Sequence, residues 1–516
     1  MEIPLLLQPI AILLSTALLT PIIDIIGKKV KVEKIRDLSA IAGFVAAFYS
    51  LISLHQAVSS TGRQTYILGT FGVPAGGVQL TADQLSVYMA LIFCGIGLLV
   101  AIYSVRYMEV DSGLDKYYAL LLTLVAGMIG VAFSGDFFNL YVFWEIMCIS
   151  SYTLVSFRKY RWEPVEAGFK YLVMSTVGSL LALYAISLLY GLTGTVNLKE
   201  LSTMISSGQV SAGSLSLYFA IGMIITGFGV TASIVPLHTW LPDAHPAAPS
   251  SISAMLSGVV IKTGVYAMCR SLFTIFAPAS FDYGTVLMIF GILTMTVANL
   301  MALMQRDIKR LLAYSSIVNI GYILTGVGIG AYALTHYSSS PGLATPIAVF
   351  ALMGAMFHIL NHAVGKGLLF LCSGCFVHEA KTRDIPELEG IGRRMTWTGT
   401  SFSIGLLALA GVPPLSGFWS KLFIILAGFS LPEDSFLKFI SILVVLNSIF
   451  AASYYLWLMQ RIMLKEPKPK IAHAVEAPAS MLLPIVILAA VTIVIGIWPG
   501  AIISLAEGAG RALLGG

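Results

Sequence analysis

Charged residues are scarce in this sequence. Asp, Glu, Lys and Arg make up 11% of its 516 positions, whereas hydrophobic residues make up 57% and the mean hydropathy is +0.89. An ordinary soluble domain carries about 25% charged residues, so this composition excludes that class and predicts a chain surrounded by lipid. The net charge of +5 needs no acidic partner, and no contact with nucleic acid is expected.

Cofactor motifs are absent as well. The five cysteines fall in or beside apolar runs, where free cysteine behaves as a small apolar residue. Cys372 and Cys375 form a single C-x-x-C, but no second pair completes a zinc or iron–sulfur site, and no Walker, Rossmann or haem-attachment motif is present. We therefore expect no cofactor, no metal and no catalytic residue in this chain, so that any redox chemistry would belong to another chain.

Long apolar runs dominate what is there. Windows of about 20 apolar residues predict an all-α, polytopic membrane protein of about 14 transmembrane helices. The predicted spans are 5–26, 37–57, 80–105, 115–134, 137–157, 166–192, 214–236, 250–274, 283–304, 309–331, 344–376, 398–428, 436–461 and 478–506. The first span precedes a basic cluster rather than following one, so it is expected to be a retained helix and not a signal peptide.

Breaks are expected in some of these helices. Pro236 and Pro242 should interrupt the seventh helix at membrane depth, because proline cannot continue a helical hydrogen-bond ladder. The eleventh span is too long for one straight crossing and is predicted to break near Gly365 or Gly367. The segment GVPPLSGFW (411–419) resembles IVPLHTW (234–240) in ending an apolar span with proline and tryptophan. This similarity predicts matching breaks in helices 7 and 12 of two inverted repeats.

Basic residues alternate from loop to loop. One side of the predicted helices holds 22 lysines and arginines, although the loop 237–249 on that side has none. The opposite side holds five, which are Arg63, Lys199, Arg270, Lys438 and Arg511. By the positive-inside rule, the richer side is cytoplasmic, and both termini lie on the outer side of the cell (plasma) membrane.

Three ionisable residues stand together in FHILNHAVGKGLLF (357–370). His358, His362 and Lys366 lie at i, i+4 and i+8, so on a helix they share one face at intervals of about 6 Å. Ionisable groups are costly in hydrocarbon and usually face a bundle interior or a water-filled path. A single buried histidine is more often a packing residue, but three such groups on one face favour a proton relay.

Further charged residues lie inside other spans. They are Glu145, Lys262 and Lys421, with His238 at the broken end of the seventh span as a weaker candidate. An ammonium loses solvation in a low dielectric and a nearby carboxylate restores its charge, so changing their separation can move a proton. Histidine can pass that proton on. A structural salt bridge between Glu145 and a lysine is the alternative for any one pair, but it does not explain charges in four different helices.

Five ordered segments are similar to a known family, the antiporter-like subunits shared by respiratory complex I, Mrp-type cation/proton antiporters and energy-converting membrane-bound hydrogenases. They are FWEIMCISSYTLVS (143–156), VPLHTWLPDAHPAAPSSISAMLSGVVIKTGVY (235–266), RDIKRLLAYSSIVNIGY (306–322), FHILNHAVGKGLLF (357–370) and GVPPLSGFWSKLF (411–423). The match covers roughly residues 80–465 and is most similar to the D-type Mrp subunit and its hydrogenase counterpart.

The resemblance implies an organisation and a set of site residues. Two inverted five-helix repeats would occupy 115–274 (helices 4–8) and 275–465 (helices 9–13), with helices 1–3 at 1–114 and helix 14 at 466–516. Proton translocation would fall to Glu145, Lys262, His358, His362, Lys366 and Lys421. The family usually has a lysine on helix seven, five residues before the proline matching Pro236, where this chain has Thr231.

The function implied is that of a proton-translocating, non-catalytic subunit, with sodium as a second candidate ion. It would serve a multi-subunit energy-converting complex, such as a membrane-bound hydrogenase or a related oxidoreductase, or an Mrp antiporter. The expected partners are other membrane subunits, protons or sodium, and the lipid bilayer. Two alternatives stay open: a standalone cation/proton antiporter, and a quinone-binding oxidoreductase subunit, which the missing cofactor motifs disfavour.

The charge pattern predicts that the loop 158–170 faces the cytoplasm. In an Arg161→Cys variant, the new thiol should react with a membrane-impermeant reagent only after the cells are permeabilised. Labelling of intact and permeabilised cells is the measurement, and reaction from outside intact cells would overturn the topology.

Overall fold

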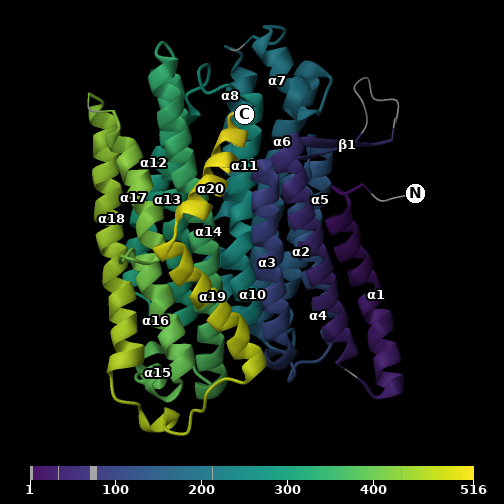
Figure 1. Ribbon diagram of the computed structural model, residues 1–516, viewed down its shortest axis with the longest axis vertical. Coiled ribbons are helices and arrows are strands. Elements are labelled where there is room, and N and C mark those ends of the chain that lie inside the picture. The colour runs from purple at the N-terminus through teal and green to yellow at the C-terminus, as the bar shows by residue number, and fades with distance from the viewer. Residues whose placement is uncertain (1–3, 33, 70–77, 212, 432, 516) are drawn as a thin grey trace.

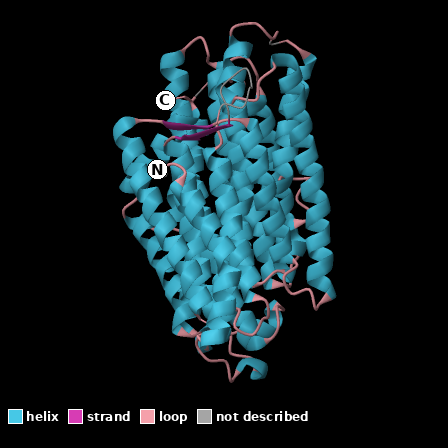
Figure 2. Ribbon diagram, turned by 90° about the vertical axis from the view of Figure 1, so that its right-hand side faces the viewer, coloured by secondary structure: helices cyan, strands magenta, loops and turns pink. Residues whose placement is uncertain are grey.

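The computed structural model describes residues 4–32, 34–69, 78–211, 213–431 and 433–515, which form one bundle of long helices (Figure 1, Figure 2). In this part of the chain, 13 helices are long and apolar enough to cross a membrane. They are α1 (Gln8–Val30), α2 (Ile35–Thr61), α3 (Gln84–Tyr107), α4 (Leu114–Phe133), α5 (Phe137–Val155), α6 (Trp162–Thr193), α8 (Leu215–Ala232), the continuous span α10 (Ser250–Met255), η1 (Leu256–Val260) and α11 (Ile261–Ile275), then α12 (Tyr283–Leu303), α13 (Ile308–His336), α14 (Pro341–Ala380), α18 (Ser435–Met459) and α19 (Ala479–Ile497). The prediction of a polytopic helical membrane protein is confirmed.

The count differs from 14 because the predicted twelfth span is interrupted. Its two halves, α16 (Thr396–Ala410) and α17 (Ser416–Phe429), have 15 and 14 residues, and each is too short to cross alone. Pro413 and Pro414 lie between them and lack the backbone N–H that a continuing helix would need. The break in helix 12 is therefore present.

The seventh span is interrupted as well. α8 ends at Ala232, and the chain becomes helical again only in α9 (Leu241–Ala247), so Pro236 lies in the irregular stretch between them. Pro242 does not interrupt a helix but stands in the first turn of α9, where its missing N–H costs nothing. The last span also divides, because α20 (Gly500–Leu513) follows α19 after Trp498 and Pro499. This division was not predicted from the sequence.

The predicted break near Gly365 or Gly367 is wrong. α14 is one helix of 40 residues, about 60 Å long and about twice the hydrocarbon thickness, so it extends beyond the membrane or tilts within it. A Cβ atom at Gly365 would lie 3.1 Å from Leu409 of α16. The glycine therefore permits close helix packing and does not mark a break.

Smaller elements lie at the two ends of the bundle. β1 (Gln64–Leu68) and β2 (Val78–Ala82) form an antiparallel pair, the exception to the all-α prediction within the described residues, and they lie at the upper end in Figure 1 near α7 (Leu198–Ser206). The lower end carries α15 (Ile391–Arg394). The other short elements are η2 (Ile385–Leu388), η3 (Gln460–Leu464) and η4 (Pro469–Ile471).

Asp243 explains how the one loop without a basic residue can still lie on the basic side. In the loop 237–249, Asp243 pairs with Lys170 at 3.1 Å and with Arg310 at 2.7 Å. The loop therefore lies at the same end as its basic neighbours, as the alternating pattern requires. Two basic residues assigned to loops are instead buried within helices, Arg270 in α11 and Lys309 in α13.

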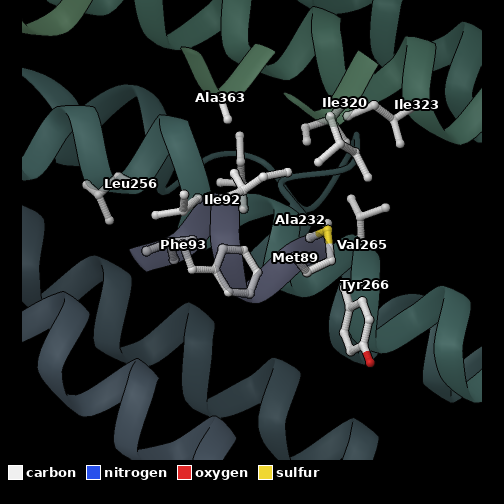
Figure 3. Close-up of a cluster of buried hydrophobic side chains, with 14 of the residues drawn as sticks. Met89, Ile92, Phe93, Ala232, Leu256, Val265, Tyr266, Ile320, Ile323 and Ala363 are labelled. Carbon is white, nitrogen blue, oxygen red and sulfur yellow. The ribbon is translucent and has the colours of Figure 1, made fainter. Parts of the chain in front are cut away.

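Two helices form the centre of the bundle. Every residue from Ser250 to Phe273 and from Leu311 to Ala333 is buried, which is typical of helices surrounded on all sides by others. Figure 3 shows part of this core, where Met89, Leu256, Val265, Ile320 and Ala363 converge from five segments of the chain. Because these helices have no lipid-facing side, any polar residue on them must find a partner within the protein.

Glu389 holds the segment around α15 to the end of α18. Its carboxylate accepts hydrogen bonds from Arg461, and Lys468 lies 3.3 Å away. The hydrogen bond from Arg461 holds the pKa of Glu389 below its ordinary value, against the opposing effect of burial. Because the folded pKa is depressed, the stabilisation is present above the unfolded pKa of about 4.3 and is lost as the pH falls through the folded pKa.

Glu389→Gln should therefore lower the apparent unfolding temperature in detergent at pH 7 by about 2 °C, since the partner arginine is partly exposed. The difference from the wild type should shrink as the pH falls from about 4 through the folded pKa of Glu389, below which both states are protonated. Glu466→Gln, which removes a highly exposed partner of Arg393, is the matched control and should have little effect. An equal effect of Glu389→Gln at both pH values would show that its charge is not responsible.

Candidate functional site

Helix α14 carries His358, His362 and Lys366 on one buried face, as predicted. All three have no exposed surface. The Lys366 ammonium donates to the Leu312 carbonyl at 3.0 Å and to the Ser315 hydroxyl, both on α13. The face of α14 predicted to relay protons is therefore packed against the buried helix α13.

His358 is hydrogen-bonded on both ring nitrogens. Its Nε2 lies 3.1 Å from Asn319 Oδ1 on α13, and its Nδ1 lies 2.8 Å from Ser420 Oγ on α17. Asn319 Nδ2 donates to the Ser315 carbonyl at 2.6 Å, so its Oδ1 faces the histidine and accepts from Nε2–H. Nδ1 is then the nitrogen without a proton. It accepts a hydrogen bond from the Ser420 hydroxyl and can take up a proton from that side.

Lys262 joins the same group of residues from α11. Its ammonium donates to the Ser257 carbonyl in the π-helical turn η1, which directly precedes α11. The Ser257 hydroxyl lies 2.6 Å from that of Ser316, which in turn donates to the Leu312 carbonyl at 2.8 Å. The Leu312 carbonyl, which also accepts from Lys366, thus joins Lys366 to the Ser316 and Ser257 hydroxyls, and Lys262 binds the same turn at the Ser257 carbonyl. A π turn beside a functional residue is a common arrangement.

Lys421 lies where helix 12 is broken. Its ammonium donates to the Leu409 carbonyl at 2.8 Å, and the Ala410 carbonyl is 3.4 Å away. These carbonyls end α16 and have no partner in a continuing helix, and they form the negative end of its dipole. The ammonium also lies 4.9 Å from the Tyr322 ring, which is 5.5 Å from the His358 ring. The break thus supplies a cation site next to His358.

These residues form a chain across four segments, which we call the central polar row. It consists of Lys262, Ser257, Ser316, Ser315, Lys366, Asn319, His358, Ser420 and Lys421. Hydrogen bonds join its members as far as Ser420, with Ser316 and Ser315 linked through the Leu312 carbonyl to which both donate, and Lys421 follows Ser420 in α17. Among the described residues, none of its three lysines forms an ion pair with a carboxylate. Their charges are held by dipoles alone.

Two buried histidines lie beside the row without hydrogen bonds to described residues. Both ring nitrogens of His362 and of His245 are unpartnered. The His362 ring stacks at 6.3 Å on that of His358, and the His245 ring stacks at 4.4 Å on Phe370. A buried polar group without a partner is rare in proteins and is often part of a functional site.

A cavity of about 560 Å³ enters the bundle from the basic end. Its lining is polar and includes Arg158, Lys381 and Arg383. At its inner part lies Lys309, whose ammonium donates to the Ala248 carbonyl at 2.6 Å. Pro246, the sequence neighbour of the buried His245, also lines this cavity. The cavity therefore reaches the chain next to His245.

Glu145 is not brought to the row. It lies on a stripe of α5 whose other members, Phe138, Val142 and Ile149, are 58%, 40% and 49% exposed. Its Oε1 is buried and has no hydrogen-bond partner among the described residues, and no ion pair there joins it to a lysine. The alternative of a salt bridge between Glu145 and Lys262 is therefore not realised within the described chain.

The two weaker candidates lie near the break in helix 7. Thr231 is buried in the last turn of α8, which packs closely on α11, since a Cβ at Gly264 would lie 2.6 Å from the Ala232 nitrogen. His238 is half-buried in the break, with its ring 6.4 Å from Tyr314. Neither residue is hydrogen-bonded to the row.

The hydroxyl and amide members of the row, and also His245, were not predicted from the sequence. Ser315, Asn319 and Tyr322 stand at i, i+4 and i+7 on α13, so a search for polar residues on one face of an apolar helix would have found them. Lys309 was assigned to the membrane edge because it follows Arg306 and Asp307 in a basic loop. The structure buries it.

Comparison with known proteins identifies relatives over most of the chain. Residues 134–449 match the family model described as "NADH:quinone oxidoreductase/Mrp antiporter, TM", and residues 75–118 match "NADH-Ubiquinone oxidoreductase (complex I), chain 5 N-terminus". The chain is 31% identical to NADH-quinone oxidoreductase subunit N of Desulforudis audaxviator, covering 84% of each. It is 28% identical to F(420)H(2) dehydrogenase subunit N of Methanosarcina mazei, covering 92% of this chain and 93% of that one.

The fold is shared as well. A chain in the structure of the membrane-bound sulfane sulfur reductase, an archaeal respiratory membrane complex, superposes with a TM-score of 0.84 at 30% identity, covering 99% of this chain and 97% of that one. The family model spans more than half of the sequence. This chain therefore belongs to the family of antiporter-like membrane subunits shared by complex I, Mrp antiporters and related respiratory complexes.

Proposed function

We propose that this chain moves protons through the central polar row as a non-catalytic subunit of a multi-subunit membrane complex, with sodium as a second candidate ion. The observation that carries the proposal is that Lys262, Lys366 and Lys421 are buried, connected by neutral groups and unpaired with any described carboxylate. A salt bridge would fix each charge in place. Neutral dipoles leave the proton exchangeable between neighbouring bases.

The residues of the row have distinct parts in such a transfer. The Ser315 hydroxyl accepts a hydrogen bond from Lys366, and the Ser315 carbonyl orients Asn319, which fixes the His358 ring with Nδ1 as acceptor. The Ser420 hydroxyl contacts His358 Nδ1, and Lys421 is the next residue of α17. His362 stands about one turn before Lys366 on α14, and its two ring nitrogens have no partner among the described residues, so it can accept a proton from that amine.

Access from the basic end would follow the cavity beside Lys309. Protons would reach His245 from this cavity, and from His245 they would pass to Lys262 at the start of the row. On the charge rule, this end is cytoplasmic, and both termini lie outside the cell membrane. The route requires His245 to rotate or a water molecule to bridge it, since its nitrogens make no hydrogen bond to described residues.

The position of Glu145 on α5 favours contact with a partner subunit. A carboxylate on an otherwise apolar, exposed helix stripe is costly against lipid. The cost disappears if another membrane subunit covers this face of α5 and supplies a donor or a cation to Glu145. The similar chain of the sulfane sulfur reductase is itself part of a respiratory membrane complex. Co-purification of further membrane subunits in mild detergent distinguishes this proposal from a standalone antiporter.

Two inverted repeats remain part of the proposal, with boundaries at 115–274 and 275–465. Matching features support them. Asp136 caps α5 and forms an isolated β-bridge with Asn197, whereas Asp307 caps α13 and forms one with Asp384. The first bridge lies near β2 and α7, and the second lies near α15 at the other end of the bundle.

Breaking the row should abolish transport. In reconstituted vesicles, Lys421→Ala and Asn319→Leu should each lower proton flux by about tenfold or more, because each removes a buried polar partner that has no substitute. Flux driven by a pH gradient, normalised to the amount of reconstituted protein, is the measurement, with sodium added in a second series.

Two matched variants serve as controls. Lys199→Ala removes a lysine outside the spans, and Asn447→Leu removes a buried amide that pairs with Asn299 at 3.0 Å and makes no hydrogen bond to a member of the row. Both should keep flux within about twofold of the wild type. Equal flux in Lys421→Ala, Asn319→Leu and the controls would mean that the row has only a structural role.

A further inference from the structure

Positive charge is concentrated at one place on the basic-poor end of the bundle. Five basic residues of the sequence belong to that end, and three of them line two adjoining cavities of about 700 and 230 Å³. Arg63 lines both, Arg511 lines the larger and Arg270 the smaller. Asp83 and the end of α20 are also shared by both cavities, so they form one polar hollow.

Arg63 is the unsatisfied cation of this hollow. Arg270 is paired with Asp83 at 2.7 Å, and Arg511 is paired with Glu507 at 2.7 Å. Burial acts to raise the pKa of Asp83, but the Arg270 guanidinium holds that pKa below its ordinary value, so the pair stays charged. Arg63 is exposed and forms no ion pair with a described residue. Three arginines and two carboxylates leave one positive charge, which is available to pair with an anion.

The polar hollow continues into an apolar groove. A third cavity of about 250 Å³ shares Thr345, Val349 and Arg511 with the larger one. Glu507 lines it beside Arg511, and its apolar part runs along α14 past Phe350 to Met353. From Thr345 to Met353 the helix rises about 12 Å, which matches the length of roughly ten methylene groups. Arg511 thus stands at the junction between a polar hollow and an apolar groove.

We propose that an anionic phospholipid occupies this site. Its phosphodiester would bind Arg63 and Arg511, whose guanidinium groups suit paired hydrogen bonds to phosphate oxygens. One acyl chain would lie in the groove against Val349, Phe350 and Met353. The acyl chain would end on α14, the helix that also carries His358. The lipid would therefore pack directly against the helix that supports the central polar row.

The proposal can be tested by lipid retention, independently of transport. The full-length protein is purified from membranes and titrated with vesicles of phosphatidylglycerol or phosphatidylcholine that carry a fluorescent lipid. Bound lipid is then counted by native mass spectrometry. The wild type should retain phosphatidylglycerol in preference, and Arg63→Gln should lower that affinity by about tenfold, since it removes a charge-assisted contact. Because Arg63 is exposed and has no described ion-pair partner, this variant should fold normally.

Two comparisons complete the test. Lys199→Gln, which removes another basic residue of the same end outside the hollow, should retain lipid as the wild type does. Val349→Phe, which fills the groove, should weaken the binding of phosphatidylglycerol but not that of inorganic phosphate. If inorganic phosphate displaces the lipid fully at millimolar concentration, the site recognises the free anion alone and the proposal fails. Equal retention of both lipids, or no effect of Arg63→Gln, would also overturn it.

Discussion

The structure depends on how three ammonium groups are accommodated inside a hydrocarbon layer without carboxylates. Moving an unpaired ion into such a medium is costly, so each lysine needs oriented dipoles close by. Lys366 takes them from Leu312 and Ser315, and Lys262 from the π turn at Ser257. Lys421 takes them from the carbonyls at the end of α16 that have no helical partner. The helix irregularities and buried hydroxyls of this bundle are the means by which these charges are solvated.

This requirement explains the arrangement of the elements. α13 must be central because it supplies partners to α14 and to the segment containing η1. α14 must be continuous because His358 and Lys366 need fixed heights to reach Asn319 and Ser315. The break between α16 and α17 must lie at membrane depth because only there can its carbonyls hold Lys421 next to His358 and Tyr322. The regular helices set the spacing between the polar side chains. The helix break and the π turn provide the carbonyl dipoles that hold Lys421 and Lys262.

Much of this was predictable from the sequence. Runs of apolar residues predicted the span 250–274 almost to the residue, since Ser250–Ile275 is helical, and the i, i+4, i+8 spacing predicted the buried face of α14. The connections of the row were not predictable, although the spacing on α13 marks a polar face, because serine on an apolar helix can satisfy itself on its own backbone, as Ser315 does on Leu312. Such a residue gives no sign of a distant partner. Glu145 was assigned to the interior because hydropathy says nothing about which side of a helix faces lipid.

The central claim is that one connected path runs from Lys262 to Lys421, in place of two separate paths, one in each five-helix repeat. Steps in series fail together, whereas parallel paths fail independently, so the interaction between two distant variants distinguishes them. Proton flux in vesicles should be measured for Lys262→Met, for Lys421→Met and for the double variant at equal protein content. A single path predicts that each single variant loses nearly all flux and that the double variant loses no more than the worse single one. Single variants that each keep about half of the flux, with a double variant that keeps none, would contradict it.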